Sequence, residues 1–308
     1  MRNKHGVVAT MQTCAALLSL ALVCSFLIVC LRSNCFRLHL RCFLHRNCLV
    51  EKRQEQPLAA DGTSSAWAPP PHFDNLDLGV PGKCDQVVNR EGYAIGYVEE
   101  WEQPSWVAYR LTKNEVMSRK ASRLDSFMAD PLITTGSATL DDYKGSGFDR
   151  GHLAPAGDMH WSDKVMLESF YMSNMSPQNP SFNRGAWARL EQAVRRFAYA
   201  EGSVFVVTGP IVTEDDNATI GANKVRVPGF YYKAIYDETP PEKMIAFILP
   251  NRGTKKSLDS FVVSVDDVEE ATGLNFFSQL SQDIQMRLES NSEPDKWAWR
   301  DERRGGRE

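Results

Sequence analysis

Three stretches decide how this chain of 308 residues folds: GFDRGHLAP at residues 147–155, YMSNMSPQ at 171–178 and NRGAWARLE at 183–191. Arg150 and His152 in the first stretch are two positions apart, so both side chains point to the same side of an extended strand. The third stretch has Asn183 just ahead of a predicted helix and Glu191 two turns along it. The pattern predicts that a strand and a helix present these side chains to one cleft.

The residue types match the requirements of phosphodiester hydrolysis. A water molecule must lose a proton before it attacks phosphorus, and His152 is suited to accept it because a histidine has a pKa of about 6.5. Arg150 offers bidentate contact to phosphate oxygens. Asn183 and Glu191 offer hard oxygen atoms, which Mg²⁺ accepts directly or through its bound waters. The sequence therefore predicts a magnesium-assisted hydrolysis at this site.

Each of these residues taken singly also has an ordinary structural interpretation. A histidine at the end of a strand, such as His152, often only takes part in a salt bridge. Asn183 is equally suited to be a helix N-cap, and Glu191 to be a solvated residue on a helix surface. Their occurrence in this order and with these neighbours favours the chemical interpretation.

In combination the three stretches resemble the DNA/RNA non-specific endonuclease family, which includes secreted bacterial sugar-non-specific nucleases and mitochondrial endonuclease G. The resemblance runs from about Asp85 to Phe277, and Phe170–Glu191 is most similar to the bacterial members. It implies an α+β protein with the ββα-metal nuclease fold. In that fold two strands and a helix hold one magnesium ion, and a central antiparallel sheet is flanked by helices.

The resemblance also implies a role for each matching residue. His152 matches the general base of the family, Asn183 matches the one direct protein ligand of the metal, and Glu191 matches the acid that holds metal-bound waters. Three more residues match supporting positions: Arg150 of the motif, Arg123 as an upstream arginine that stabilises the phosphoryl transition state, and Asn174 near the histidine.

The implied activity is endonucleolytic hydrolysis of DNA and RNA with little regard for sequence, with Mg²⁺ as the cofactor and Mn²⁺ as a substitute. Contacts to DNA and RNA are expected through backbone phosphates, which carry no base information. Two alternatives stay open: a catalytically inactive, membrane-tethered nucleic-acid-binding protein, and a metal-dependent phosphodiesterase for small diesters. A homodimer also stays open, because family members are often dimers.

The remaining pattern predicts an α+β domain, since strand-like and helix-like segments mix without a Walker or Rossmann glycine loop. Strands are expected where residues alternate in polarity or form short apolar runs, and helices where apolar residues recur every three or four positions. The predicted strands are 93–98, 105–111, 203–207, 230–236 and 244–249, and the predicted helices lie around 186–197 and at 264–272 and 275–288.

The charge distribution limits how the chain can meet nucleic acid. The formal net charge is -4, but residues 1–50 hold six basic residues and no acid, so the remainder carries a net charge of -10. A contact with a polyanion must therefore be local and supported by a metal ion. Six of the seven cysteines lie within the first 48 residues and only Cys84 lies beyond, so the folded part has no internal disulfide.

The first 50 residues are predicted to be a membrane anchor or an uncleaved export signal with a basic juxtamembrane stretch. Residues 6–31 carry no charge, and about 20 apolar residues suffice to span a bilayer. A location at a bacterial envelope or outside the cell is favoured. A mitochondrial presequence, with a location in the intermembrane space, is the alternative. Residues 51–77 are predicted to be a linker, 78–300 the nuclease domain and 301–308 a charged tail.

Overall fold

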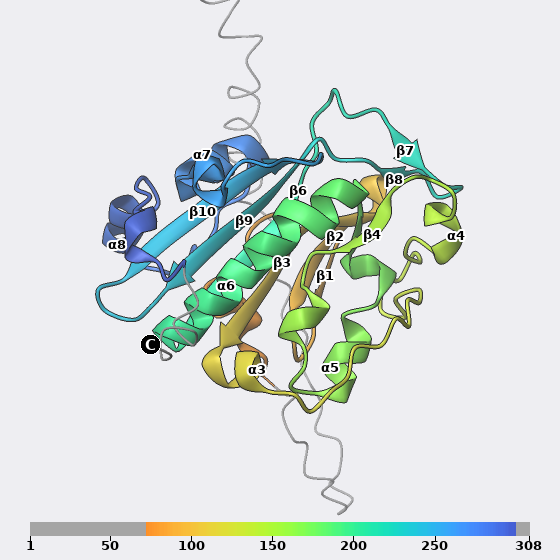
Figure 1. Ribbon diagram of the computed structural model, residues 1–308. Coiled ribbons are helices and arrows are strands. Elements are labelled where there is room, and N and C mark those ends of the chain that lie inside the picture. The colour runs from red at the N-terminus through yellow and green to blue at the C-terminus, as the bar shows by residue number, and fades with distance from the viewer. Residues whose placement is uncertain (1–71, 300–308) are drawn as a thin grey trace, which may run out of the picture. The chain divides into compact units, whose positions relative to one another are not determined.

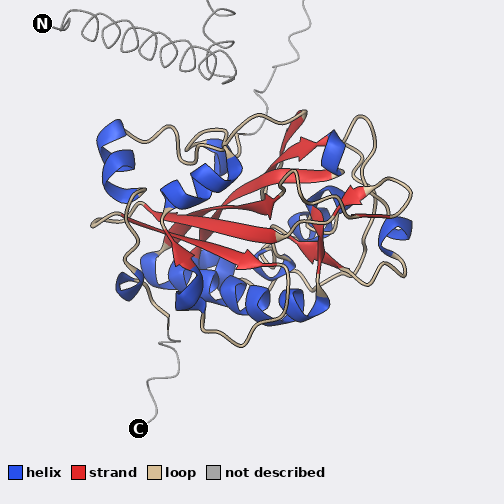
Figure 2. Ribbon diagram, turned by 90° about the horizontal axis from the view of Figure 1, so that it is seen from above, coloured by secondary structure: helices blue, strands red, loops and turns tan. Residues whose placement is uncertain are grey.

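A seven-stranded sheet forms the centre of the computed structural model, which describes residues 72–299. Its neighbouring strands all pair antiparallel. Helices lie on both sides of the sheet (Figure 2). The order across the sheet is β1 (Gln86–Asn89), β2 (Ala94–Val98), β3 (Gln103–Thr112), β6 (Ser203–Ile211), β9 (Phe230–Asp237), β10 (Lys243–Pro250) and β11 (Val262–Val263).

The predicted strands are confirmed, with one difference at β6. The predicted strand ends at residue 207, but β6 continues through Gly209 and Pro210 to Ile211. Gly209 permits this because a Cβ atom there would come within 2.3 Å of the Ser105 carbonyl oxygen. The proline is tolerated because the pairing of β6 with β3 ends at Thr208, so its missing N–H falls beyond that ladder.

The two faces of the sheet are covered by different helices, because successive side chains of a strand point to opposite faces. Val107 and Tyr109 belong to the hydrophobic core beneath α6 (Ala188–Glu201), the amphipathic helix that crosses the sheet in Figure 1. Trp106 and Ala108 belong to the core on the other face. That face is covered by α7 (Val265–Thr272) and α8 (Gln282–Leu288).

The predicted helix 275–288 is shorter in the structure and spans only the range of α8. Its first half turns instead, since Phe277 has a positive φ of 49° and the Asn275 N–H bonds to the Pro81 carbonyl. Phe276 and Phe277 are both buried in the core under α7. Burial of these two rings outweighs the helical periodicity of the segment, because each large apolar side chain contributes about 1.5–3 kcal/mol when removed from water.

The long connection between β3 and β6 builds the part of the protein that holds the candidate site. A two-stranded hairpin pairs β4 (Asp149–His152) with β5 (Met175–Gln178). A π-helical turn, η5 (Phe182–Trp187), then leads directly into α6. The same connection contains α3 (Lys113–Met117), α4 (Leu140–Tyr143), α5 (Asp163–Glu168) and the 3₁₀ turns η3 (Ala156–Asp158) and η4 (Met172–Asn174).

Smaller elements complete the domain, and one of them, η1, places the start of the packed domain earlier than predicted. The others are β7 (Thr219–Ile220), β8 (Val225–Arg226) and the 3₁₀ turns η2 (Glu99–Trp101), η6 (Leu258–Phe261) and η7 (Pro294–Lys296). The turn η1 (Asp74–Leu76) falls in the predicted linker, yet Asn75 is buried and donates to the Arg90 carbonyl at 2.7 Å. The packed part therefore begins by Asp74, four residues before the predicted start.

The predicted anchor at residues 6–31 lies outside the described residues, as does the predicted tail at 301–308. Among residues 72–299, no helix has both the length and the apolar character needed to cross a membrane.

The β4–β5 hairpin yields a stability prediction at Gly151, which lies between Arg150 and His152. A Cβ atom at Gly151 would come within 2.2 Å of the Gln178 side chain, and Gln178 is fully buried. We expect Gly151→Ala to lower the free energy of unfolding by about 1–3 kcal/mol, as overpacking does. Denaturant unfolding measures the loss. Gly185→Ala is the control, because nothing lies within 4 Å of its Cβ position; equal losses in both variants would contradict the packing argument.

Candidate active site

A cavity of about 610 Å³ opens at the junction of the hairpin and η5. Its walls include three arginines, Arg123, Arg150 and Arg184, against the two carboxylates Asp125 and Asp149. Asn183 also lines it. The cavity thus combines guanidinium groups, which bind phosphate in a bidentate way, with an amide and a carboxylate that offer hard oxygen atoms.

His152 lies at the end of β4 against aromatic side chains. Its ring packs edge-on against Phe170, with centroids 4.8 Å apart, and lies 5.7 Å from the Phe127 ring. No described residue forms a hydrogen bond with either ring nitrogen, and the Nε2 atom is buried. Burial, helped by the positive charges of Arg123 and Arg150, lowers the pKa of His152 to about 3. The imidazole is therefore neutral at physiological pH, so one ring nitrogen carries a free lone pair. No described residue competes for that lone pair.

The two arginines beside the histidine are held by the same aromatic rings. The Arg150 guanidinium carbon lies 4.2 Å from the centroid of Phe127, and that of Arg123 lies 5.2 Å from the centroid of Phe170. Arg150 and His152 thus share Phe127 as a neighbour, which confirms that they face the same side of β4. The N–H donors of Arg150 have no described partner besides this ring contact, whereas Arg123 also donates from Nε to Asp125 Oδ1 at 3.1 Å.

Arg119 lies close to Arg123 in the sequence but is used differently in the structure. Its Nη1 donates to the Val116 carbonyl at 2.9 Å, and it lines a separate hollow of about 360 Å³ together with His160. Of these two arginines only Arg123 lines the cavity that contains Arg150 and Asn183.

Asn174 lies behind the histidine rather than in the cavity. It is fully buried, and its Nδ2 donates at 2.9 Å to the carbonyls of Ala154 and Ser169 while its Oδ1 accepts from the Ala154 N–H at 2.9 Å. The amide is therefore fully used in holding the chain that follows His152. The sequence predicted a supporting polar residue here, and the geometry makes it a positioning residue.

Asn183 lies in the π-helical turn η5, in contact with strand β4. Its Nδ2 donates to Asp149 Oδ2 at 3.0 Å, and Arg184 binds both oxygens of the same carboxylate at 2.6 and 2.9 Å. Since Nδ2 points at Asp149, the amide oxygen Oδ1 is directed elsewhere and has no described partner. The structural interpretation as an N-cap does not hold, because the helical turn already begins at Phe182.

Glu191 lies on α6 within a second group of charges. Its neighbours are Arg195, Lys233 and Asp158, and Arg195 also pairs with Asp158 at 2.7 Å. Burial raises the pKa of Glu191, and the positive charges of Arg195 and Lys233 oppose this rise. Lys233 is fully buried with its Nζ 4.8 Å from the centroid of Trp187. Glu191 is therefore half-buried in the field of nearby cations and is not a fully solvated surface residue.

The structure brings Arg123, Arg150 and Asn183 together around one cavity. His152 does not line this cavity but lies within electrostatic range of Arg123 and Arg150, and Glu191 lies within electrostatic range of Arg123. Three contributors were missed by the sequence analysis: Asp149, Arg195 and Lys233. Arg195 follows Glu191 by four residues and so shares its helix face, which is a signal that the sequence does contain. Lys233 lies in the otherwise mostly apolar strand β9, and its positive charge there is the only sign in the sequence of a role at the site.

The hairpin that ends in a histidine, followed by a helical segment that presents an asparagine, defines a protein class. This arrangement beside a larger antiparallel sheet is the ββα-metal nuclease fold. The chain belongs to the DNA/RNA non-specific endonuclease family, whose sequence model matches residues 72–283. The family uses divalent metal ions.

The chain is similar to several known nucleases. It is 39% identical over 221 residues to Nuclease C1 of Cunninghamella echinulata var. echinulata, which covers 67% of this chain and 88% of that protein. It is 34% identical to the mitochondrial nuclease EXOG of Mus musculus, covering 74% of this chain and 68% of that protein. The match to mitochondrial endonuclease G of Homo sapiens is 34% identical and covers 64% of this chain and 71% of that protein.

A solved structure supports the same assignment. The crystal structure of an endonuclease G bound to its inhibitor aligns with a TM-score of 0.62 at 34% identity, covering 68% of this chain and 92% of that one. None of the three organisms named above is bacterial, so the stronger likeness of Phe170–Glu191 to bacterial members stays a prediction.

The buried histidine gives a prediction for stability against pH. The pKa of about 3 in the folded protein lies below the value of about 6.5 in an unfolded chain, so unfolding takes up a proton between these values. The contribution of neutral His152 is therefore complete above about pH 6.5 and is lost as the pH falls toward 3. The loss has a slope of at most about 1.4 kcal/mol per pH unit.

We expect His152→Asn to flatten this part of the pH profile relative to the unmodified chain. Urea unfolding at several pH values between 7 and 4 measures the difference. His72→Asn is the control, because His72 is an exposed histidine. Parallel profiles for the unmodified chain and His152→Asn would contradict the lowered pKa.

Proposed function

We propose that this chain is a magnesium-dependent endonuclease that hydrolyses the phosphodiester bonds of DNA and RNA without sequence preference, with His152 as the general base. The observation that carries the proposal is the orientation of Asn183. Its amide N–H₂ group is bound to Asp149 at 3.0 Å, which directs its oxygen away from Asp149, in a cavity that Arg123 and Arg150 also line. The same two arginines act electrostatically on the unpartnered, neutral His152.

The residues present fit a magnesium ion. Asn183 Oδ1 is a free, neutral oxygen donor, and a single protein ligand of this kind leaves most of the coordination sphere to water and phosphate, as Mg²⁺ prefers. Glu191 supplies a carboxylate for metal-bound waters. Because these are oxygen donors, Mn²⁺ is expected to substitute. When bound, the ion supplies positive charge to the phosphoryl oxygens and to the leaving sugar oxygen.

His152 is suited to accept the proton of the attacking water. It is neutral, and only Nε2 is buried without a partner, so Nδ1 is the ring nitrogen that solvent reaches. The lowered pKa reflects, after burial, the charges of Arg123 and Arg150. A phosphate bound between these arginines offsets their charges, so the histidine becomes more basic when the substrate is in place.

Arg150 and Arg123 bind the scissile phosphate and stabilise the charge that develops on it. All of these contacts address the backbone of the nucleic acid, which explains activity on both DNA and RNA and the lack of base preference. The complete set of chemical groups also argues against a catalytically inactive, membrane-tethered binding protein. The competing function is then a phosphodiesterase for small diesters. Comparing the turnover of long DNA with that of a small diester separates the two activities.

The relatives also bear on location. EXOG and endonuclease G are named as mitochondrial proteins, which supports the mitochondrial alternative for this chain over a bacterial envelope. Membrane contact through residues 6–31 and a homodimer stay predictions.

Removing the proposed base provides the first functional test. We expect His152→Ala to lower the rate of plasmid cleavage in Mg²⁺ by about 10²–10⁴-fold or more, because the attacking water loses its proton acceptor. His72→Ala, at an exposed histidine, is expected to cleave normally. A near-normal rate for His152→Ala would remove this residue from the mechanism.

Removing the carboxylate that orients Asn183 provides the second test. We expect Asp149→Ala to weaken Mg²⁺ binding by about 10–100-fold, as the loss of an outer-shell partner does, and Asn183→Ala to weaken it further. Calorimetric titration with Mg²⁺ reads this out independently of activity. The exposed Asp141→Ala is the control for a lost negative charge. Equal affinities for Asp149→Ala and Asp141→Ala would refute the orienting role.

A further inference from the structure

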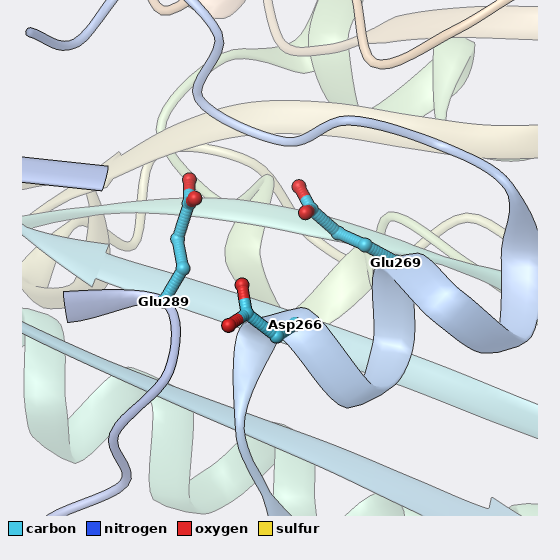
Figure 3. A group of neighbouring side chains, drawn as sticks. All are labelled: Asp266, Glu269 and Glu289. Carbon is cyan, nitrogen blue, oxygen red and sulfur yellow. The ribbon is translucent and has the colours of Figure 1, made fainter. Parts of the chain in front are cut away.

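Three carboxylates gather on the far face of the sheet from α6. Asp266 and Glu269 lie on α7, and Glu289 directly follows α8 (Figure 3). The backbones are joined as well, since the Asp266 N–H donates to the Glu289 carbonyl at 3.0 Å. Both helices pack on the core that contains Val268 and Leu288, whereas Glu191 and the nuclease cavity belong to the α6 face.

The side chains of this acidic trio converge. One oxygen of each carboxylate lies within 4.8 Å of the corresponding oxygens of the other two, and the three groups turn toward one another in Figure 3. Glu289 is only 6% exposed, and its Oε1 has no hydrogen-bond partner among the described residues. Glu269 is partly satisfied by the Phe276 N–H at 2.6 Å, and Asp266 is exposed.

No lysine or arginine within residues 72–299 forms an ion pair with any member of the trio. A buried carboxylate without a partner is costly, because burial removes its hydration while the neighbouring negative charges repel it. A cation or a shared proton is required to remove this cost. Burial and the two neighbouring carboxylates raise the pKa of Glu289 to about 7, so the proton is the competing occupant.

We propose that Asp266, Glu269 and Glu289 form a second cation site, suited to Ca²⁺, that joins α7 to the end of α8. Ca²⁺ binds oxygen ligands at about 2.3–2.6 Å, so oxygens separated by up to about 4.8 Å can share one ion without movement of the backbone. The trio offers only hard oxygen donors, as Ca²⁺ sites do, and none of the nitrogen or sulfur donors that are typical of zinc and copper sites. Exposed Asp266 leaves one side open to the waters that complete a coordination sphere of about six to eight ligands.

The site serves stability rather than hydrolysis. It lies on the opposite face of the sheet from the nuclease cavity, and it connects two segments that are 23 residues apart in the sequence, Asp266 and Glu289. One consequence concerns chelators: EDTA would remove this ion together with the ion at Asn183, so a chelator alone does not report on the catalytic metal.

Calcium titration of the full chain carrying Asn183→Ala tests the proposal, because that background removes the direct ligand of the nuclease site. We expect one Ca²⁺ to bind with a dissociation constant in the range of about 10⁻⁵–10⁻³ M. Glu289→Gln keeps the shape of the side chain and is expected to weaken binding at least tenfold. Glu270→Gln, an exposed neighbour on the same helix, is the matched control and is expected to bind normally.

Thermal unfolding supplies a second readout. Without Ca²⁺, Glu289→Gln is expected to melt at or above the temperature of its parent, because a buried charge is removed; with millimolar Ca²⁺ the parent is expected to overtake it. If Glu289→Gln fails to fold, the exposed Asp266→Asn provides the same comparison. Absence of Ca²⁺ binding at millimolar concentration, or equal binding by Glu289→Gln and its parent, would overturn the proposal in favour of a shared proton.

Discussion

The carboxylate of Asp149 is the contact on which the candidate site depends. It comes from the first residue of β4, and it holds both the Asn183 amide and the Arg184 guanidinium of the turn that leads into α6. One side chain thus sets the relation between the strand that ends in His152 and the helix that carries Glu191. The chemistry that we propose requires this relation, because a base and a metal ligand act together only when both reach one phosphate.

The sheet provides the rigid support for this contact. Strands β3, β6 and β9 are buried almost throughout, and α6 covers them with a continuous apolar stripe. Functional side chains that are mounted on such a support lose little freedom when substrate binds. The histidine is fixed differently, by ring contacts with Phe127 and Phe170 rather than by hydrogen bonds. It therefore stays oriented while Nδ1 stays available for a proton.

Much of the site was predictable, because the residues concerned are close in the sequence and their spacing is regular. The shared side of Arg150 and His152 follows from strand parity, and the position of Glu191 follows from helical spacing. Asp149 was part of the same motif, but nothing in the sequence shows that its partner lies 34 residues ahead at Asn183. Lys233 was missed for the same reason, since the contact of β9 with the α6 face arises only when the sheet forms.

The fold was predicted where one-dimensional periodicity and burial agree, and missed where tertiary packing dominates. The strands β2, β3, β9 and β10 and the helix α6 appeared as expected. The segment 275–281 did not become helical, because two phenylalanines are buried in the core under α7. The continuation of β6 through Pro210 depends on where its pairing with β3 ends, which is a property of the sheet and not of the strand alone.

The position of a bound metal ion shows whether Asn183 is the metal ligand of this cavity. A crystal structure of the protein grown with Mn²⁺, with anomalous scattering measured at the manganese edge, locates the ion without any assumption about mechanism. We expect a peak at coordination distance, about 2.0–2.2 Å, from Asn183 Oδ1 and next to the ring of His152. A fully occupied manganese in the nuclease cavity that makes no contact with Asn183, or a cavity that takes up none at saturating Mn²⁺, would contradict this expectation.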